Sequence, residues 1–307
     1  MHKVLVTGGA GFIGAAVANH LTKQGYQVTV LDALTYAADI SRLKPTIHDI
    51  IVHDITAPIP DIGQFDYILH LAAETHVDNS ITDPLRFVKT NVLGTANMLE
   101  FARKQTDLVM FLYFSTDEVF GPAPGKTLYK EWDRYNSGNP YSATKAGGEE
   151  LVLAYGNTYR LPVVITHTMN VFGPTQHEEK FIPSTIYKIL KGETVIIHSN
   201  AGRTRAGSRF YIHANNVARA VEFVMDKGKL QDKYNIVGER EVDNLTLAQM
   251  IAELLNKPLY HRMVDFHSSR PGHDLRYGLD GAKLAELGWR PKDSFERGLA
   301  KTVRWYL

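Results

Sequence analysis

The 307-residue sequence contains no cysteine. Without cysteine the chain can form no disulfide, build no thiolate-rich zinc or iron–sulfur centre and use no thiolate nucleophile. It also has almost no net charge, +1 at pH 7. Nucleic acids and anionic membranes are bound through concentrated basic charge, so neither is expected as a partner. An anionic small molecule would have to be held by individual arginines.

Long apolar runs are missing as well, and no window is suited to a membrane span. The chain opens on a strand-like segment rather than on a basic segment followed by an apolar stretch. We therefore expect a cytoplasmic protein. The 13 histidines are scattered, and none forms a helical pair beside carboxylates. No metal site is predicted, and a metal-dependent hydrolase is the weakest of the alternatives.

The hydrophobic fraction of 44% is that of a globular protein. Short β-branched runs alternate with helical patterns in the first half, which predicts an α/β fold with a Rossmann-type, doubly wound parallel sheet. The expected strands are residues 3–7, 27–32, 49–53, 66–71, 109–115 and 163–167, and the expected helices are residues 12–24, 84–105, 142–159 and 295–305. The pattern loosens after residue 174. We expect a dinucleotide-binding domain of residues 1–174 and a smaller α/β substrate lobe of residues 175–307, with a cleft between them and some exchange of chain.

Three glycines, Gly8, Gly11 and Gly14, follow the first expected strand and open the first expected helix. Glycines in this context allow a tight turn and let the backbone approach a pyrophosphate at the helix N-terminus. Asp32 ends the second strand, where a carboxylate can accept hydrogen bonds from an adenosine ribose, and no basic residue follows it directly. This favours NAD over NADP. A turn-capping role for Asp32, and likewise for Asp54 after the third strand, stays open.

Tyr141 and Lys145 are four residues apart at the start of an expected helix, so they share one face. A lysine ammonium there can lower the pKa of the phenol, which can then take a proton from a substrate hydroxyl. The spacing alone is common. Its position after the glycine turn, after Asp32 and after residues 115–118 is what favours a catalytic pair.

Taken together, these motifs resemble the extended short-chain dehydrogenase/reductases, and within that NAD-dependent epimerase/dehydratase family the dTDP-glucose 4,6-dehydratases. The resemblance runs nearly end to end and rests on residues 7–14, 34–37, 71–78, 115–121 and 141–145. The most specific match is the adjacent pair Asp117 and Glu118, which is typically not intact in relatives that only epimerise or decarboxylate. The resemblance implies a homodimer formed through two long helices.

The chemistry of a 4,6-dehydratase needs two carboxyl groups. Oxidation at C4 of a hexose acidifies the C5 proton, which Glu118 is placed to remove as the base. Loss of the C6 hydroxyl needs a proton donor, and Asp117, beside a second carboxylate in a closed site, is the candidate acid. Thr116 is expected to hydrogen-bond the C4 oxygen. Solvated loop acids and a plain turn threonine are the alternatives.

The expected contacts follow from the motifs and from the resemblance. The expected NAD contacts are Gly8, Gly11, Phe12, Ile13, Gly14, Asp32, Ala33, Leu34, Thr35, Asp54, Ile55, Leu71, Ala72, Ala73, Thr75, Thr90, Ser115, Tyr141 and Lys145. The expected substrate contacts are Thr75, Thr116, Asn170, Glu179, Lys180, Phe181, His198, Arg209, Asn244, Arg270 and His273. Guanidinium groups suit a diphosphate, because they can bind its oxygens bidentately.

Several residues depart from the family pattern. Phe120 and Phe172 lose hydroxyl contacts without removing chemistry, whereas Phe210, Asn216 and Ser269 fall in the expected nucleotide-binding region and leave the nucleotide open among dTDP, UDP and CDP. A nucleotide-sugar 4-epimerase remains the nearest alternative function, although it has no need of the Asp117–Glu118 pair. A non-catalytic NAD-binding protein on the same fold is the alternative from another class.

Overall fold

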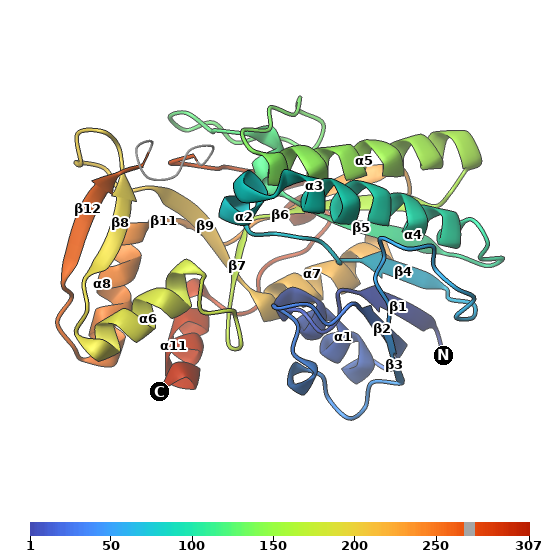
Figure 1. Ribbon diagram of the computed structural model, residues 1–307, viewed down its shortest axis with the longest axis horizontal. Coiled ribbons are helices and arrows are strands. Elements are labelled where there is room, and N and C mark those ends of the chain that lie inside the picture. The colour runs from blue at the N-terminus through green and yellow to red at the C-terminus, as the bar shows by residue number, and fades with distance from the viewer. Residues whose placement is uncertain (267–273) are drawn as a thin grey trace.

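The computed structural model describes residues 1–266 and 274–307. A seven-stranded parallel sheet is its largest element (Figure 1), with strands in the order β3–β2–β1–β4–β5–β6–β10. The strands are β1 (Lys3–Thr7), β2 (Gln27–Asp32), β3 (Asp49–Val52), β4 (Tyr67–His70), β5 (Met110–Thr116), β6 (Val163–Thr168) and β10 (Asp232–Ile236). The central strands are apolar runs because both of their faces are buried. The predicted Rossmann-type fold is confirmed.

Helices cover both faces of this sheet. α1 (Phe12–Lys23) and α7 (Ala214–Lys227) pack on one face, where their apolar side chains meet alternate residues of β1 such as Val4 and Val6. α4 (Gly94–Ala102) and α5 (Pro140–Tyr159) pack on the other face, which Leu5 of the same strand points toward. This alternation along β1 is what a sheet buried on both sides requires.

The expected long helix over residues 84–105 is interrupted. After α2 (Val77–Thr82), the chain forms α3 (Pro84–Phe87), a π-helix η2 (Val88–Leu93) and then α4. The buried Asn91 lies within the π-helical segment, and its amide donates to the Glu74 backbone oxygen and the Thr144 hydroxyl. The wider turn accompanies these contacts, and such π segments are frequent at functional sites.

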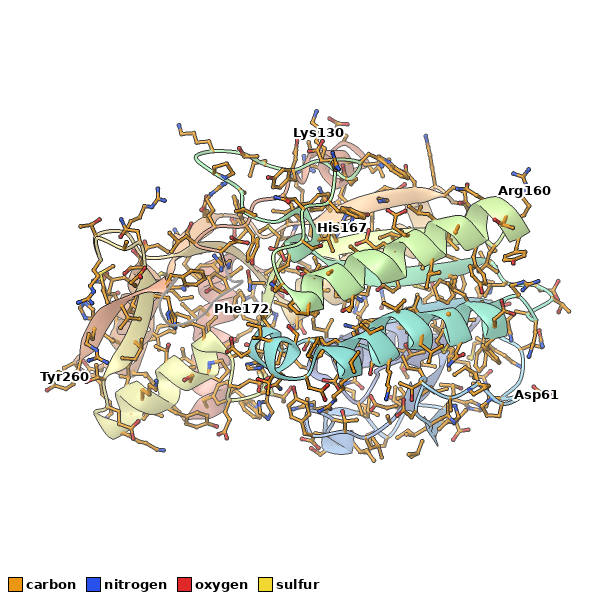
Figure 2. The ribbon with its side chains drawn as sticks, turned by 45° about the horizontal axis from the view of Figure 1, so that its top comes forward. Asp61, Lys130, Arg160, His167, Phe172 and Tyr260 are labelled. Atoms are coloured by element: carbon orange, nitrogen blue, oxygen red, sulfur yellow. The ribbon has the colours of Figure 1, made fainter. Side chains whose placement is uncertain are left out.

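The smaller lobe holds two further sheets, of order β11–β9–β7 and β12–β8. Their strands are β7 (Asn170–Phe172), β8 (Val195–Ser199), β9 (Ser208–His213), β11 (Glu241–Asp243) and β12 (His261–Asp265). Helices α6 (Phe181–Lys191), α8 (Asn244–Leu255) and α11 (Phe295–Tyr306) complete a second apolar core. Figure 2 shows Phe172 at the junction of the lobes, where its ring packs on Tyr211, His213 and Phe295.

Chain from beyond residue 174 also returns to the large sheet. α7 packs beside α1, β10 forms the edge strand next to β6, and α10 (Ala282–Glu286) places Leu284 in the same core. The division into lobes at residue 174 stays a prediction. Short 3-10 helices are η1 (Ile40–Arg42) and η3 (Asp117–Phe120). No helix within the described residues is long and apolar enough to cross a bilayer.

Candidate active site

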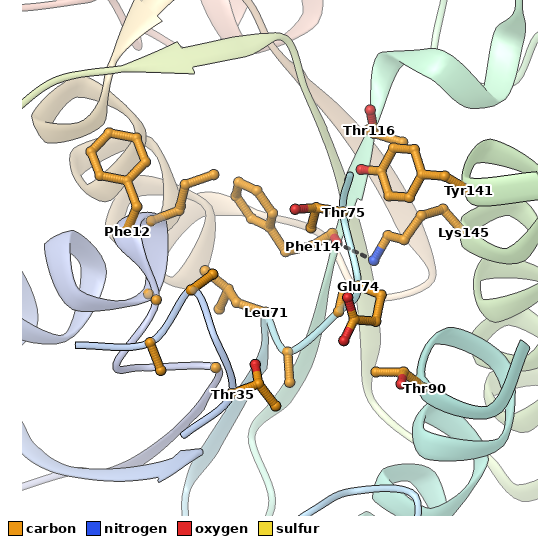
Figure 3. A pocket seen from close by; sticks show the side chains of 18 of the residues that line it. Phe12, Thr35, Leu71, Glu74, Thr75, Thr90, Phe114, Thr116, Tyr141 and Lys145 are labelled. Atoms are coloured by element: carbon orange, nitrogen blue, oxygen red, sulfur yellow. Dashed lines mark hydrogen bonds between the residues drawn. The ribbon is translucent and has the colours of Figure 1, made fainter. Parts of the chain in front are cut away.

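A cleft of about 860 Å³ opens at the carboxyl ends of the parallel strands (Figure 3). Ligands of open α/β sheets bind at this edge, because the turns there present helix N-termini and strand-end side chains. Residues from the smaller lobe, including Asn170, Glu179 and Lys180, complete the lining. The cleft therefore lies where the sequence predicts a ligand site.

The glycine turn at the floor of the cleft has no room for side chains. Gly8 has a φ of 68°, and a Cβ there would lie 2.7 Å from the Cα of Ala72. A Cβ on Gly14 would lie 2.1 Å from the Gly8 carbonyl oxygen. The backbone of β1, the turn and α1 therefore come together as closely as a pyrophosphate cradle requires.

Asp32 caps the turn after the glycines and also lines the cleft, so the ribose contact stays a prediction. Its Oδ2 accepts a hydrogen bond from the Ala10 amide at 2.9 Å, and its Oδ1 accepts one from the Leu34 amide at 2.8 Å. The carboxylate thus fixes the turn, and since each oxygen has a second lone pair it can still accept from a ribose in the cleft that it lines. Asp54 also lines the cleft and accepts a hydrogen bond from the Thr56 amide at 2.9 Å.

Of the residues expected to contact NAD, Leu34 alone does not line the cleft. Leu34 instead adopts a positive φ of 51° in the turn after β2, where it offers its amide to Asp32. The donor set fits a dinucleotide: a glycine cradle without side chains at one end of the cleft and a carboxylate at the end of β2.

Tyr141 and Lys145 lie in the first turns of α5, which begins at Pro140 after the N-cap Asn139. The Lys145 ammonium donates to the Phe114 carbonyl oxygen at 2.8 Å. Burial lowers the pKa of Lys145 to about 7, and Glu149, one helical turn further on, acts in the opposite direction.

The expectation that Lys145 lowers the pKa of the Tyr141 phenol is wrong for this structure. Burial, and then the charges of Glu118 and Asp117, raise the pKa of Tyr141, while the neighbouring Thr116 side chain has a smaller opposite effect. After burial, the Glu118 charge is therefore the largest influence that raises the pKa of Tyr141.

Asp117 and Glu118 follow β5 directly and form the start of η3. The Thr116 hydroxyl caps this segment by accepting from the Glu118 amide at 3.3 Å, and it donates to Asp117 Oδ1 at 3.1 Å. The other oxygen of Asp117, Oδ2, is buried with no hydrogen-bond partner in the described part of the chain. Burial and the Glu118 charge raise the pKa of Asp117 to about 7, and burial raises the pKa of Glu118. Asp117 is buried and Glu118 is partly buried, so neither is a fully solvated loop acid.

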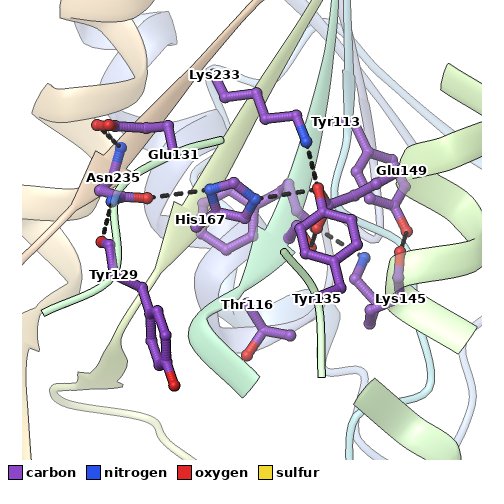
Figure 4. A network of polar contacts seen from close by, with 12 residues as sticks. Tyr113, Thr116, Tyr129, Glu131, Tyr135, Lys145, Glu149, His167, Lys233 and Asn235 are labelled. Atoms are coloured by element: carbon purple, nitrogen blue, oxygen red, sulfur yellow. Dashed lines mark hydrogen bonds and ion pairs between the residues drawn. The ribbon is translucent and has the colours of Figure 1, made fainter. Parts of the chain in front are cut away.

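A buried polar cluster, which the sequence did not predict, surrounds Glu149 of α5 and includes side chains of β5 and β6 (Figure 4). At its centre the Glu149 carboxylate accepts from the Ser115 hydroxyl, from the Tyr135 hydroxyl and from His167 at 3.0 Å. The Lys233 ammonium lies 3.7 Å from the same carboxylate. Glu149 is four residues after Lys145, so its place on the helix face that carries Lys145 could have been read from the spacing.

The expected substrate residues are divided. Thr75, Thr116, Asn170, Glu179 and Lys180 line the cleft, whereas Phe181, His198, Arg209 and Asn244 do not. Arg270 and His273 lie outside the described residues.

The Arg209 guanidinium, expected to bind a diphosphate, is already engaged by backbone carbonyl groups. Its guanidinium donates to the backbone oxygens of Ser208, Asp274 and Leu275 at 2.6–2.7 Å. It also lies over the Tyr277 ring, 4.6 Å from the ring centroid. These contacts use most of the hydrogen-bond donors of the guanidinium, so Arg209 holds β9 and residues 274–275 together.

Several polar residues of the cleft carry no sequence motif. Arg42 donates to the carbonyl oxygens of Ala10 and Ala37, and Arg86 pairs with Glu74 at 2.5 Å. Lys89, Gln176 and His177 also line the cleft. Apart from the neutral Gln176 these are basic side chains, so they place basic groups in the cleft of a nearly neutral chain, and only the fold brings them together.

Comparisons with known proteins agree with this geometry. The family model described as GDP-mannose 4,6 dehydratase matches residues 5–302. The dTDP-glucose 4,6-dehydratase of Salmonella typhimurium is 37% identical over 338 positions, which cover 99% of this chain and 92% of that protein. The trifunctional UDP-glucose 4,6-dehydratase/UDP-4-keto-6-deoxy-D-glucose 3,5-epimerase/UDP-4-keto-L-rhamnose-reductase of Arabidopsis thaliana is 38% identical, over 99% of this chain and 47% of that protein. The crystal structure of the dTDP-glucose 4,6-dehydratase DesIV of Streptomyces venezuelae, with NAD bound, has a TM-score of 0.90 and 36% identity and covers 99% of this chain and 96% of that chain.

Proposed function

The chain belongs to the GDP-mannose 4,6 dehydratase family, and on that premise we propose that it is an NAD-dependent nucleotide-sugar 4,6-dehydratase. Its substrate would be an NDP-glucose, with dTDP-glucose the first choice, and its product the NDP-4-keto-6-deoxyglucose. The observation that carries the proposal is the Asp117–Glu118 pair beside Tyr141, with Asp117 buried and Glu118 partly buried in the cleft wall, because only water elimination needs both an acid and a base in addition to the tyrosine.

The glycine turn and Asp32 would hold NAD, which would supply the oxidation at C4 and the later reduction at C6, so that no external oxidant is consumed.

The chain's own residues would move the protons. Tyr141 would take the proton of the C4 hydroxyl while Thr116 hydrogen-bonds the C4 oxygen; this step requires the ionised phenol, although burial and the Glu118 charge raise the pKa of Tyr141. Glu118 would then remove the C5 proton, and Asp117 would give its proton to the departing C6 hydroxyl, which leaves as water. Glu118 would return its proton to C5 when C6 is reduced, and release of the proton from Tyr141 and uptake of one by Asp117 would restore the starting state. A pKa of about 7 suits Asp117 to donation at neutral pH.

A nucleotide-sugar 4-epimerase is the second candidate, since it shares the glycine turn, Tyr141 and Lys145. Epimerisation needs no proton donor at C6, so it gives no reason for a buried carboxyl whose pKa is raised to about 7. A non-catalytic NAD-binding protein would have no use for the pair at all.

The deciding experiment incubates the protein with NAD and, separately, dTDP-, UDP- and CDP-glucose, and follows the product by mass spectrometry and NMR. We expect loss of one water with one nucleotide. Glu118→Gln should still bind NAD but should stop exchange of the C5 proton with solvent, and exchange at the native rate would remove Glu118 from the base role. Unchanged mass with inversion at C4 would establish the epimerase instead, and NAD binding without any reaction would favour the non-catalytic alternative.

We further propose a homodimer formed through the helices on the outer face of the large domain. Exposed apolar side chains gather along α2, α3 and η2, including Ile81, Leu85, Val88 and Leu93, which is 49% exposed. Figure 1 shows α3, α4 and α5 running side by side on this face. Apolar surface of this kind is typical of an interface between subunits.

A further inference from the structure

The carboxylate of Glu118 is held by two donors from distant parts of the chain. The Asn139 amide donates to Oε2 at 3.3 Å, and the Tyr277 hydroxyl donates to the same oxygen at 3.4 Å. Both hydrogen bonds that side chains of the described residues make to this carboxylate therefore end on Oε2. Glu118 lines the cleft, so the oxygen available to a ligand is Oε1.

Each donor is fixed by contacts of its own. Asn139 is the N-cap of α5, and its Oδ1 accepts from the Ser142 amide at 2.8 Å. One side chain thus ties Glu118 to the helix that carries Tyr141 and Lys145, because its amide nitrogen and its amide oxygen serve different partners.

The second donor comes from the C-terminal part of the chain. Tyr277 is only 3% exposed and packs in an apolar cluster with Val119 and Phe120, next to the carboxyl pair. The Arg209 guanidinium lies over its ring and is itself held by three carbonyl oxygens. The phenol is therefore aimed at Glu118 by a rigid support.

We propose that Asn139 and Tyr277 are positioning residues for the base: they hold Oε2 of Glu118 so that Oε1 is the atom that takes the C5 proton. The proposal rests on the proposed dehydratase function. Neither residue touches the reacting atoms, and neither belongs to the motifs that predicted the site. Two donors to one oxygen also stabilise the ionised carboxylate, which is the form that a base requires.

The charge around Glu118 comes from several elements. Burial raises its pKa, and the Asn139 hydrogen bond and the charges of Arg209 and Lys180 lower it, while Asp274 raises it. Asp117 precedes it in η3, and Tyr141 faces it from α5. Removing either neutral donor leaves all of these charges in place, so a change in the titration of Glu118 can be assigned to the lost hydrogen bond.

Two variants test the proposal without removing Glu118. Tyr277→Phe deletes one donor, and Asn139→Ser deletes the other while keeping an oxygen that can cap α5. In each, we expect the acid limb of the pH profile for C5 proton exchange to move up by about half to one pH unit. Exchange below that limb should slow about three- to tenfold, which is the size of an ordinary net hydrogen-bond contribution and suits donors as distant as 3.3 and 3.4 Å. Oxidation at C4, followed by the absorbance of reduced NAD, should keep its rate.

Tyr129→Phe is the matched control. Tyr129 packs against the same apolar cluster, but its hydroxyl donates to the Pro122 carbonyl oxygen at 2.8 Å rather than to Glu118. Its profile should coincide with that of the unchanged protein. A shift as large as that of Tyr277→Phe would show that any lost hydroxyl in the cluster has the effect, and would overturn the positioning role.

A direct titration separates this proposal from the proposed function. NMR of glutamate labelled at the side-chain carboxyl, with the Glu118 signal assigned by Glu118→Gln, reports its pKa without any sugar. The pKa should rise in Tyr277→Phe and in Asn139→Ser and not in Tyr129→Phe. An unmoved signal in folded variants overturns the proposal whatever the protein does to sugars. A moved signal in a protein that dehydrates no nucleotide sugar refutes the dehydratase and, with it, the base role of Oε1.

Discussion

Replacing Glu149 with glutamine should strongly destabilise the protein, because it removes the negative charge that two buried basic side chains share. The Glu149 and His167 side chains are fully buried and that of Lys233 is 4% exposed. His167 lies 3.0 Å and Lys233 3.7 Å from the same carboxylate oxygen. Burying charges in this way is tolerable only while they stay paired.

The expected size follows from that pairing. Removing one partner of a buried ion pair typically costs about 3–5 kcal/mol. The lower end, about 3 kcal/mol, applies here, since the single glutamine oxygen can still accept one of the two hydrogen bonds that Ser115 and Tyr135 make to different oxygens of Glu149. Against a total of about 5–15 kcal/mol for an ordinary domain, this is a large fraction of the free energy of unfolding.

Urea unfolding followed by circular dichroism measures the loss, provided that the transition is two-state. The double variant Glu149→Gln/Lys233→Met is the control, because it removes the orphaned ammonium as well and should recover more than half of the loss. A loss below about 1 kcal/mol for the single variant, or no recovery in the double variant, would refute the reasoning from charge pairing.

The stabilisation that the Glu149 carboxylate provides should be lost as the pH falls. Burial alone would raise the pKa of Glu149, but His167, Lys233 and the Ser115 hydrogen bond outweigh burial and hold the pKa below its usual value. A carboxylate with a lowered pKa in the folded state contributes its stability above the unfolded pKa and loses it as the pH falls through the folded value. The gap between the native protein and Glu149→Gln should therefore be full at neutral pH and should close in acid.

Three further predictions concern catalysis, cofactor binding and assembly. The kcat/KM should fall as the pH rises past about 7, because Asp117 needs its proton as the acid and its pKa is raised to about 7; a flat profile to pH 9 would exclude Asp117 as the acid. Gly14→Ala should weaken NAD binding by calorimetry about 10- to 100-fold, since its Cβ would lie 2.1 Å from the Gly8 oxygen, whereas Gly202→Ala, with no neighbour closer than 3.8 Å, should bind normally. Light scattering should give twice the 34.4 kDa chain mass and Leu93→Arg should reduce it, unlike Leu230→Arg, and a monomeric native protein would sink the dimer proposal.

The strands of the first half could be predicted from the sequence because burial on both faces leaves a signal within each segment. The bounds of β1 and β2 were predicted to the residue, and the other four expected strands to within one or two. The strand β10 was missed, although Tyr234 and Ile236 are buried in the same core. Its place at the sheet edge depends on pairing with β6, which is distant in the sequence and leaves no local pattern.

The π-helix η2 likewise depends on contacts with distant segments and could not be predicted from a local pattern. Apolar periodicity over residues 84–105 predicts one helix, since a single extra residue in one turn barely changes the pattern. The change of turn accompanies contacts of Asn91 with Glu74 and Thr144, which belong to other elements. A pattern read along one helix cannot contain the positions of its neighbours.

The candidate catalytic residues at the end of β5 could be predicted from the sequence. The residues that make hydrogen bonds to them or line the same cleft could not. Asp117 and Glu118 are visible as an adjacent pair, but their surroundings come from the fold. Tyr277 reaches Glu118 from 159 residues away in the sequence, and Arg42 and Arg86 enter the cleft from segments without any motif. Only Glu149 had a local signal, its spacing from Lys145 on one helix.

The carboxyl groups of Asp117 and Glu118 differ in their hydrogen-bond partners. Asp117 has one oxygen that is buried without a hydrogen-bond partner among the described residues, which favours its neutral form. Glu118, one residue later, has one oxygen held by two donors, which favours its ionised form. Under the proposed function, this difference would separate two neighbouring acids of nearly equal intrinsic strength into a proton donor and a proton acceptor. If Tyr277→Phe raises the pKa of Glu118 toward that of Asp117, the two carboxyls should compete for one proton, and water elimination should slow even though every catalytic side chain is present.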